Sequence, residues 1–187
     1  MLAREVEARP WAEQLELDDR SYRAQVEYLF ERSPFYWEKL ADAGVASAAA
    51  AGGLGEIAQL PLTDKSELKV TASAENPFGF HFAADPSEIV RIYSTSGTTG
   101  TPTYLPLTAG DLEDWVTGSA RSYAASGVVA GQRIVSTYNA GPFVAGVALT
   151  AFERIGLCHV PVGTGNTERL LMAIELLRPE AAVLTPS

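Results

Sequence analysis

The second half of the chain alternates between segments with strand patterns and segments with helix patterns, and this alternation most constrains the fold. The short apolar segments with strand patterns are residues 89–93, 133–138, 157–162 and 181–184. The helix patterns between them begin after Thr108 and continue at 142–154 and 166–178. Such alternation predicts an α/β fold with a strand–helix layer in which the strands are mostly parallel.

The first part of the chain has helix patterns only. Apolar residues recur at helical spacing over 12–31, and a second helix is predicted over 34–42, where a proline occupies the favourable first turn. Asp64 and Glu67 have the spacing of a capping box, which predicts a short helix directly after Asp64. The small residues of 46–55 predict a loop.

Two regions follow from these patterns. We expect an N-terminal helical region over residues 1–85, and part of an α/β nucleotide-binding subdomain over residues 86–187. The last predicted strand ends close to Ser187 with no later segment to cover it, whereas parallel sheets are normally buried on both faces. The sequence therefore predicts a chain that stops within a domain.

Charge and cysteine content exclude several classes of function. The 14 basic and 23 acidic residues give a net charge of −9, which disfavours nucleic-acid and anionic-membrane partners. The N-terminus has no signal-peptide pattern, and no apolar run approaches the roughly 20 residues of a membrane span. Cys158 is the single cysteine, so a disulfide framework is excluded, and its apolar neighbours predict a buried thiol. A cytoplasmic protein is expected.

A run of hydroxyl residues and glycines, from Ser94 to Thr103, is the candidate functional loop. Glycines let backbone N–H groups approach an anion closely, and hydroxyls add further donors, so the natural ligand is a polyphosphate. The alternative is a Ser/Thr/Gly-rich surface loop without a ligand. The run is not a Walker A loop, because Gly97 and Gly100 are too close and Thr101 stands where lysine would be.

The segment Ser96-Gly97-Thr98-Thr99-Gly100-Thr101-Pro102 resembles the phosphate-binding loop of the adenylate-forming (acyl-CoA synthetase) superfamily. Thr103 after the proline, the Leu60–Leu68 segment and the run Gly165-Asn166-Thr167-Glu168-Arg169 are similar to the phenylacetate–CoA ligase branch. The resemblance implies the large N-terminal domain of an AMP-forming ligase. It also implies ATP, Mg²⁺ and CoA as cofactors, and an aryl or arylacetic-type acid as substrate.

The same resemblance assigns candidate site residues. Those implied to bind the ATP phosphates are Ser94, Thr95, Ser96, Gly97, Thr98, Thr99, Gly100 and Thr103. Those implied to contact the acyl group are Tyr138, Asn139 and Phe143, which follow a predicted strand at the edge where open α/β sheets bind ligands. The two aromatics are equally well explained as core residues. No catalytic residue or metal ligand is assigned, because the family's catalytic lysine and Mg²⁺ ligand are expected beyond Ser187.

Three functional alternatives stay open at this point. The thiol acceptor is either CoA or the phosphopantetheine arm of a carrier protein, since both present the same group. A non-catalytic nucleotide-binding module is the third reading. A homodimer is compatible with the sequence, and the histidines, His81 and His159, have no metal-type spacing.

Overall fold

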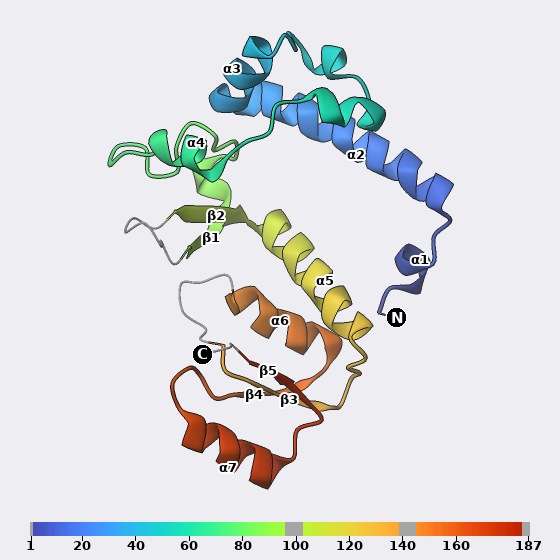
Figure 1. Cartoon of the computed structure of the whole chain (residues 1–187), viewed down its shortest axis with the longest axis vertical. Coiled ribbons are helices and arrows are strands. Elements are labelled where there is room, and N and C mark those ends of the chain that lie inside the picture. Colours follow the sequence, from blue (N-terminus) through green and yellow to red (C-terminus); the bar gives the residue numbers. More distant parts are fainter. Residues whose placement is uncertain (1, 96–102, 139–144, 185–187) are drawn as a thin grey trace. The chain divides into compact units, whose positions relative to one another are not determined.

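The computed structural model describes residues 2–95, 103–138 and 145–184 (Figure 1). These residues form two compact units. One is Ala8–Glu88, and the other combines Met1–Glu7 with Ile89–Ser187. The assignment of functions to the predicted regions 1–85 and 86–187 stays a prediction. None of the described helices is both long and apolar enough to cross a membrane.

The first unit is helical, as expected. Its α-helices are α2 (Trp11–Arg32), α3 (Pro34–Asp42) and α4 (Lys65–Val70), and its 3-10 helices are η1 (Ala48–Ala51), η2 (Leu54–Gln59) and η3 (Pro86–Glu88). The predicted capping box begins α4, because Asp64 accepts from the Ser66 N–H at 2.8 Å and Glu67 accepts from the Asp64 N–H at 2.9 Å. The predicted loop over 46–55 is wrong in one respect: it holds η1 and the start of η2, since Ser47 caps the alanine run.

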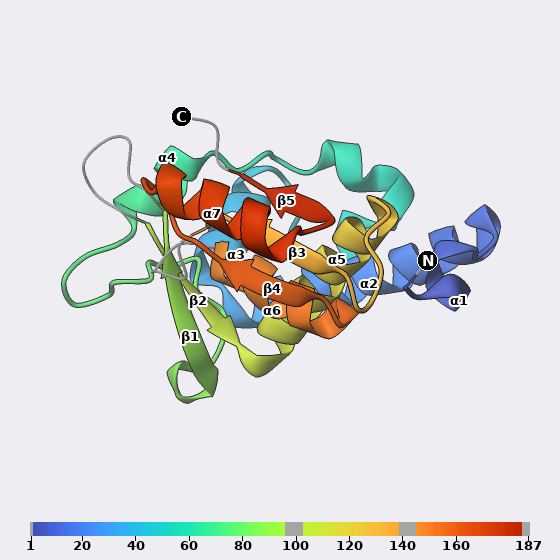
Figure 2. The same ribbon diagram turned by 90° about the horizontal axis from the view of Figure 1, so that it is seen from below.

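The second unit contains a parallel sheet. Its elements are α1 (Arg4–Glu7), β1 (Ile89–Ser94), β2 (Tyr104–Thr108), α5 (Ala109–Ala125), β3 (Arg133–Ser136), α6 (Ala145–Ile155), β4 (Cys158–Pro161), α7 (Thr167–Leu177) and β5 (Ala181–Val183). Strands β4, β3 and β5 lie side by side in that order and are parallel. Helices α6 and α7 cover opposite faces of this sheet (Figures 1 and 2). This arrangement confirms the predicted fold class.

The strand predicted over residues 89–93 forms, but it does not pair within the parallel sheet as expected. β1 does not join the three-stranded parallel sheet; it forms an antiparallel hairpin with β2, in which Ser94 pairs with Tyr104. β2 was not predicted from the sequence, because Pro106 interrupts its strand pattern. Proline removes a backbone donor, but an edge strand tolerates it.

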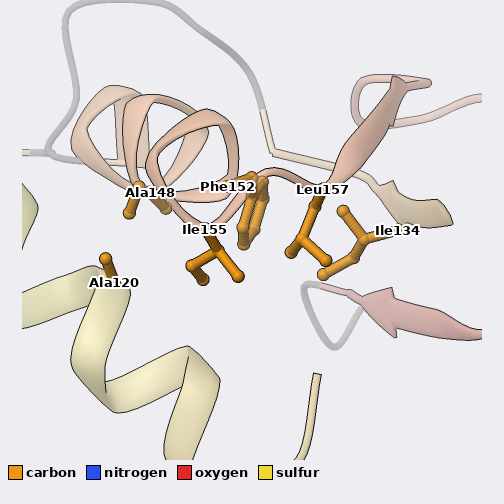
Figure 3. Close-up of a cluster of buried hydrophobic side chains, with 7 residues drawn as sticks. Ala120, Ile134, Ala148, Phe152, Ile155 and Leu157 are labelled. Atoms are coloured by element: carbon orange, nitrogen blue, oxygen red, sulfur yellow. The ribbon is translucent and has the colours of Figure 1, made fainter. Parts of the chain in front are cut away.

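The core of the α/β unit lies between α5, α6 and one face of the parallel sheet (Figure 3). The buried residues of this core are Ala120, Ile134, Ala148, Ala151, Phe152, Ile155 and Leu157. Val135 alternates with Ile134 along β3 and is also fully buried. Both faces of β3 are thus covered, as is usual for a central parallel strand.

Candidate functional site

The β1–β2 hairpin holds the two ends of the candidate phosphate loop together. The Thr95 N–H donates to the Thr103 carbonyl at 3.0 Å, and the Thr103 N–H donates to the Thr95 hydroxyl at 3.2 Å. These two hydrogen bonds close the neck on either side of the Ser96–Pro102 segment, which itself lies outside the described residues. Thr108 then caps α5, as predicted, by accepting from the Asp111 N–H at 3.2 Å.

The described part of the predicted phosphate site is its neck. Ser94, Thr95 and Thr103 are half-buried at the ends of β1 and β2. Within the described residues, the Thr103 hydroxyl has no hydrogen-bond partner. The other five predicted phosphate ligands lie outside the described residues, and they are Ser96, Gly97, Thr98, Thr99 and Gly100.

Tyr93 anchors the hairpin directly before the loop. It is buried, with 4% of its surface exposed, and it packs with Val116 of α5 and Val147 of α6. Its ring meets the Trp115 ring edge-on at 6.1 Å, and its hydroxyl accepts a hydrogen bond from Arg91 at 3.2 Å. Tyr93 is not among the site residues predicted from the sequence, although its position gives a signal: it is the last bulky residue before the hydroxyl run.

Tyr138 is the described member of the predicted acyl site; Asn139 and Phe143 lie outside the described residues. Tyr138 is half-buried two residues beyond β3 and packs against the core. Its side chain is hydrogen-bonded to that of Tyr123 of α5, and burial raises the pKa of Tyr123. Tyr123 is not among the site residues predicted from the sequence. The Tyr138 side chain is therefore held in place at the carboxyl end of a parallel strand, where the predicted acyl site lies.

A buried polar pair joins β3 to β4 beside this position. The Ser136 hydroxyl and the His159 Nε2 are 2.8 Å apart, and Ser136 is fully buried. The His159 ring packs on Phe152 at 5.1 Å. Burial lowers the pKa of His159, an effect that Glu153 partly opposes. A neutral imidazole is thus favoured inside the unit, in line with a structural residue.

The geometry overturns one further prediction, that of a buried cysteine thiol. Cys158 is exposed on β4, so the predicted buried thiol is wrong; its neighbours Leu157 and His159 turn inward, whereas the alternation of a strand turns Cys158 outward. No group of three or more His, Cys, Asp or Glu side chains within 2–95, 103–138 and 145–184 is arranged to hold a metal ion.

The run Gly165–Arg169 forms the start of a helix. Asn166 caps α7 by accepting from the Arg169 N–H at 3.0 Å. One face of α7 lines a surface depression of about 530 Å³, and its lining residues are Asn166, Glu168, Arg169, Met172, Ala173, Leu176 and Leu177. Since this depression is the outer side of one helix, we assign no ligand to it.

Comparison with known proteins shows which proteins the chain is similar to. No protein-family model matches the chain. The chain is 36% identical over 184 residues to a phenylacetate–coenzyme A ligase of Thermus thermophilus, a match that covers 98% of this chain. It is 32% identical over 163 residues to the Escherichia coli phenylacetate–coenzyme A ligase. Nearly the whole chain is thus similar to part of a phenylacetate–CoA ligase, as the resemblance of its sequence motifs predicted.

A solved structure supports the same relationship. The crystal structure of 2-hydroxyisobutyryl-CoA ligase in complex with 2-HIB-AMP and CoA superimposes with a TM-score of 0.84 at 26% identity, over 92% of this chain and 37% of that one. The Thermus and Escherichia relatives are matched over 40% and 36% of their lengths. The chain thus spans about two fifths of the length of these phenylacetate–CoA ligases.

Proposed function

We propose that this chain is the phosphate- and acyl-binding part of an AMP-forming carboxylate–CoA ligase. The observation that carries the proposal is the closed hairpin neck between Thr95 and Thr103, which flanks the sequence Ser-Gly-Thr-Thr-Gly in a chain similar to phenylacetate–CoA ligases. In the first half-reaction, a carboxylate oxygen attacks the α-phosphate of ATP, and acyl-adenylate and pyrophosphate form. In the second, a thiol attacks the acyl carbonyl, and thioester and AMP form.

The loop's role is to hold the leaving group. Backbone N–H groups between Gly97 and Gly100 and the hydroxyls of Thr98 and Thr99 donate to the β- and γ-phosphates. Donors aimed at the developing charge stabilise the transition state, and neutral donors release pyrophosphate more readily than a lysine would. The described residues offer no carboxylate cluster for Mg²⁺, so we derive no step through the metal from this chain.

The substrate is an aryl or arylacetic-type acid, bound with Tyr138, Asn139 and Phe143 against its acyl group. An aromatic ring at Phe143 suits stacking on an aryl acid. The held side chain of Tyr138 supports this placement at the end of β3. The acceptor is CoA, the partner is the acid, and the enzyme acts in the cytoplasm; carrier-protein phosphopantetheine and a homodimer are the alternatives to test.

The test uses the intact protein that contains these residues and measures its two half-reactions separately. Thr98→Val and Thr99→Val each remove one phosphate donor, so acid-dependent ATP–pyrophosphate exchange should fall by an amount equivalent to about 2–4 kcal/mol. Thioester formation from added acyl-adenylate should change much less, because pyrophosphate has already left. Phe143→Ala should change which acid is used more than it changes ATP binding.

Thr117→Val on α5 is the matched control, since it makes the same atomic change at a threonine whose hydroxyl bonds Glu113. Wild-type exchange in both loop variants, or equal loss of both half-reactions in folded protein, contradicts the assigned role of the loop. Acylation of a carrier protein in place of CoA selects the alternative acceptor.

A further inference from the structure

A contact between Tyr93 and Gly146 joins two described residues that adjoin the candidate phosphate and acyl segments in the sequence. Tyr93 immediately precedes Ser94, the first residue of the phosphate loop. Gly146 is the second residue of α6 and follows the acyl segment that contains Phe143. Tyr93 and Val147, the neighbour of Gly146, belong to one buried cluster.

The contact leaves too little room for a Cβ atom at Gly146 unless a neighbouring group shifts. A Cβ atom added to Gly146 would lie 3.0 Å from the Tyr93 hydroxyl oxygen and 3.2 Å from its ring carbon Cε1. Both distances are shorter than ordinary carbon contacts of about 3.5–4.0 Å. Tyr93 cannot easily move away, because Trp115 and Val116 of α5 pack around it and Arg91 binds its hydroxyl.

The close approach of Tyr93 therefore explains why a glycine occupies this position of the helix. Glycine within a helix costs about 1 kcal/mol relative to alanine. Gly118, inside α5, offers a contrast: nothing lies within 4 Å of a Cβ added there. Alanine is sterically acceptable at Gly118, whereas at Gly146 it would push the start of α6 away from Tyr93.

We propose that Tyr93 and Gly146 are positioning residues for adenylation, because their contact fixes the end of β1 against the start of α6, next to the phosphate and acyl segments in the sequence. This inference rests on the proposed function. Adenylation requires the carboxylate oxygen and the α-phosphorus to meet in line at about 3–3.5 Å, and a misplacement of 1 Å can reduce the rate on the order of 100-fold. The close contact between the buried Tyr93 ring and the backbone at the start of α6 fixes the described residues that adjoin both segments.

The test combines Gly146→Ala with Tyr93→Phe, which removes the oxygen nearest to the added methyl. In the intact protein, Gly146→Ala should lower the kcat of acid-dependent ATP–pyrophosphate exchange at least about tenfold, as expected for a shift of a fraction of an ångström. Thioester formation from added acyl-adenylate should fall less. Tyr93→Phe alone should have the smaller effect, and the double variant should recover part of the exchange rate lost in Gly146→Ala.

Gly118→Ala is the control, and it should leave exchange unchanged while raising the melting temperature. Gly146→Ala should lower the melting temperature, against the general preference of helices for alanine. If Gly146→Ala exchanges like Gly118→Ala, or if Tyr93→Phe gives no recovery, the inference is wrong while the proposed function stands. If the wild-type protein shows no acid-dependent exchange, the proposed function fails, and the melting temperatures still test the contact.

Discussion

At the scale of single residues, His159 makes the stability of the α/β unit depend on pH. Burial lowers its pKa below the ordinary value of 6.5. The unfolded chain therefore takes up the proton first as the pH falls. The free energy of unfolding should decrease as the pH falls below about 6.5 toward the lower pKa of the folded state. Urea unfolding at several pH values between 5.5 and 8 measures this slope.

Three substitutions test the role of His159. His159→Gln should flatten the slope in this window for the α/β unit, and His81→Gln should not, because His81 belongs to the other unit although burial lowers its pKa as well. Ser136→Ala leaves the His159 Nε2 without its partner and should cost about 1–3 kcal/mol. An unchanged slope in His159→Gln would show that its protonation does not control stability.

Residue types were easier to predict than residue partners. The hydroxyl run and Tyr138 are visible in the sequence, because composition and position beside a strand are local properties. The Ser136–His159 pair and the Tyr93–Gly146 contact join residues that are far apart in the chain, so no local pattern shows them. The prediction of a buried Cys158 was wrong because apolar neighbours in the sequence do not show which face of a strand a residue occupies.

At the scale of elements, the start of α5 links the hairpin to the helical layer through one threonine. Thr108 is the last residue of β2 and also the N-cap of α5, with Asp111 completing the capping box. Thr108→Ala should lower the free energy of unfolding by about 1 kcal/mol, because an orphan N–H loses its acceptor. Thr108→Ser keeps the hydroxyl and should retain most of that stability in the same urea titration. Equal losses in both variants would show that the cap contributes nothing.

The starts of these helices were predictable because capping residues and apolar periodicity depend on residues that are close together in the sequence. Asp64, Thr108 and Asn166 each begin the helix that was expected after them. The pairing of β1 was not predictable in the same way. An antiparallel hairpin and a parallel layer use the same short apolar segments, and the choice between them depends on β2, which Pro106 concealed.

At the scale of the whole molecule, the two units carry unequal parts of the proposed chemistry. All predicted phosphate and acyl residues belong to the unit that contains Ile89–Ser187. The Ala8–Glu88 unit is held together by hydrogen bonds of its own. The hydroxyl of the buried Ser33, for example, lies within hydrogen-bond distance of the Phe80 and His81 carbonyl oxygens, at 3.4 and 3.3 Å. The sequence predicted the helices of this unit but not the packing of the 78–82 segment against Ser33, since that contact is also distant in the chain.

The 187-residue chain by itself should not catalyse ATP–pyrophosphate exchange with any carboxylic acid. It spans about two fifths of the Thermus relative, and its described residues lack a carboxylate cluster for a metal ion. The hairpin neck is nevertheless intact, so weak binding of ATP or pyrophosphate is expected. Calorimetry on the purified chain measures that binding, and Thr98→Val should weaken it while Thr117→Val should not. Exchange that depends on added acid, in protein freed of contaminating ligases, would show that this part alone holds the complete catalytic machinery.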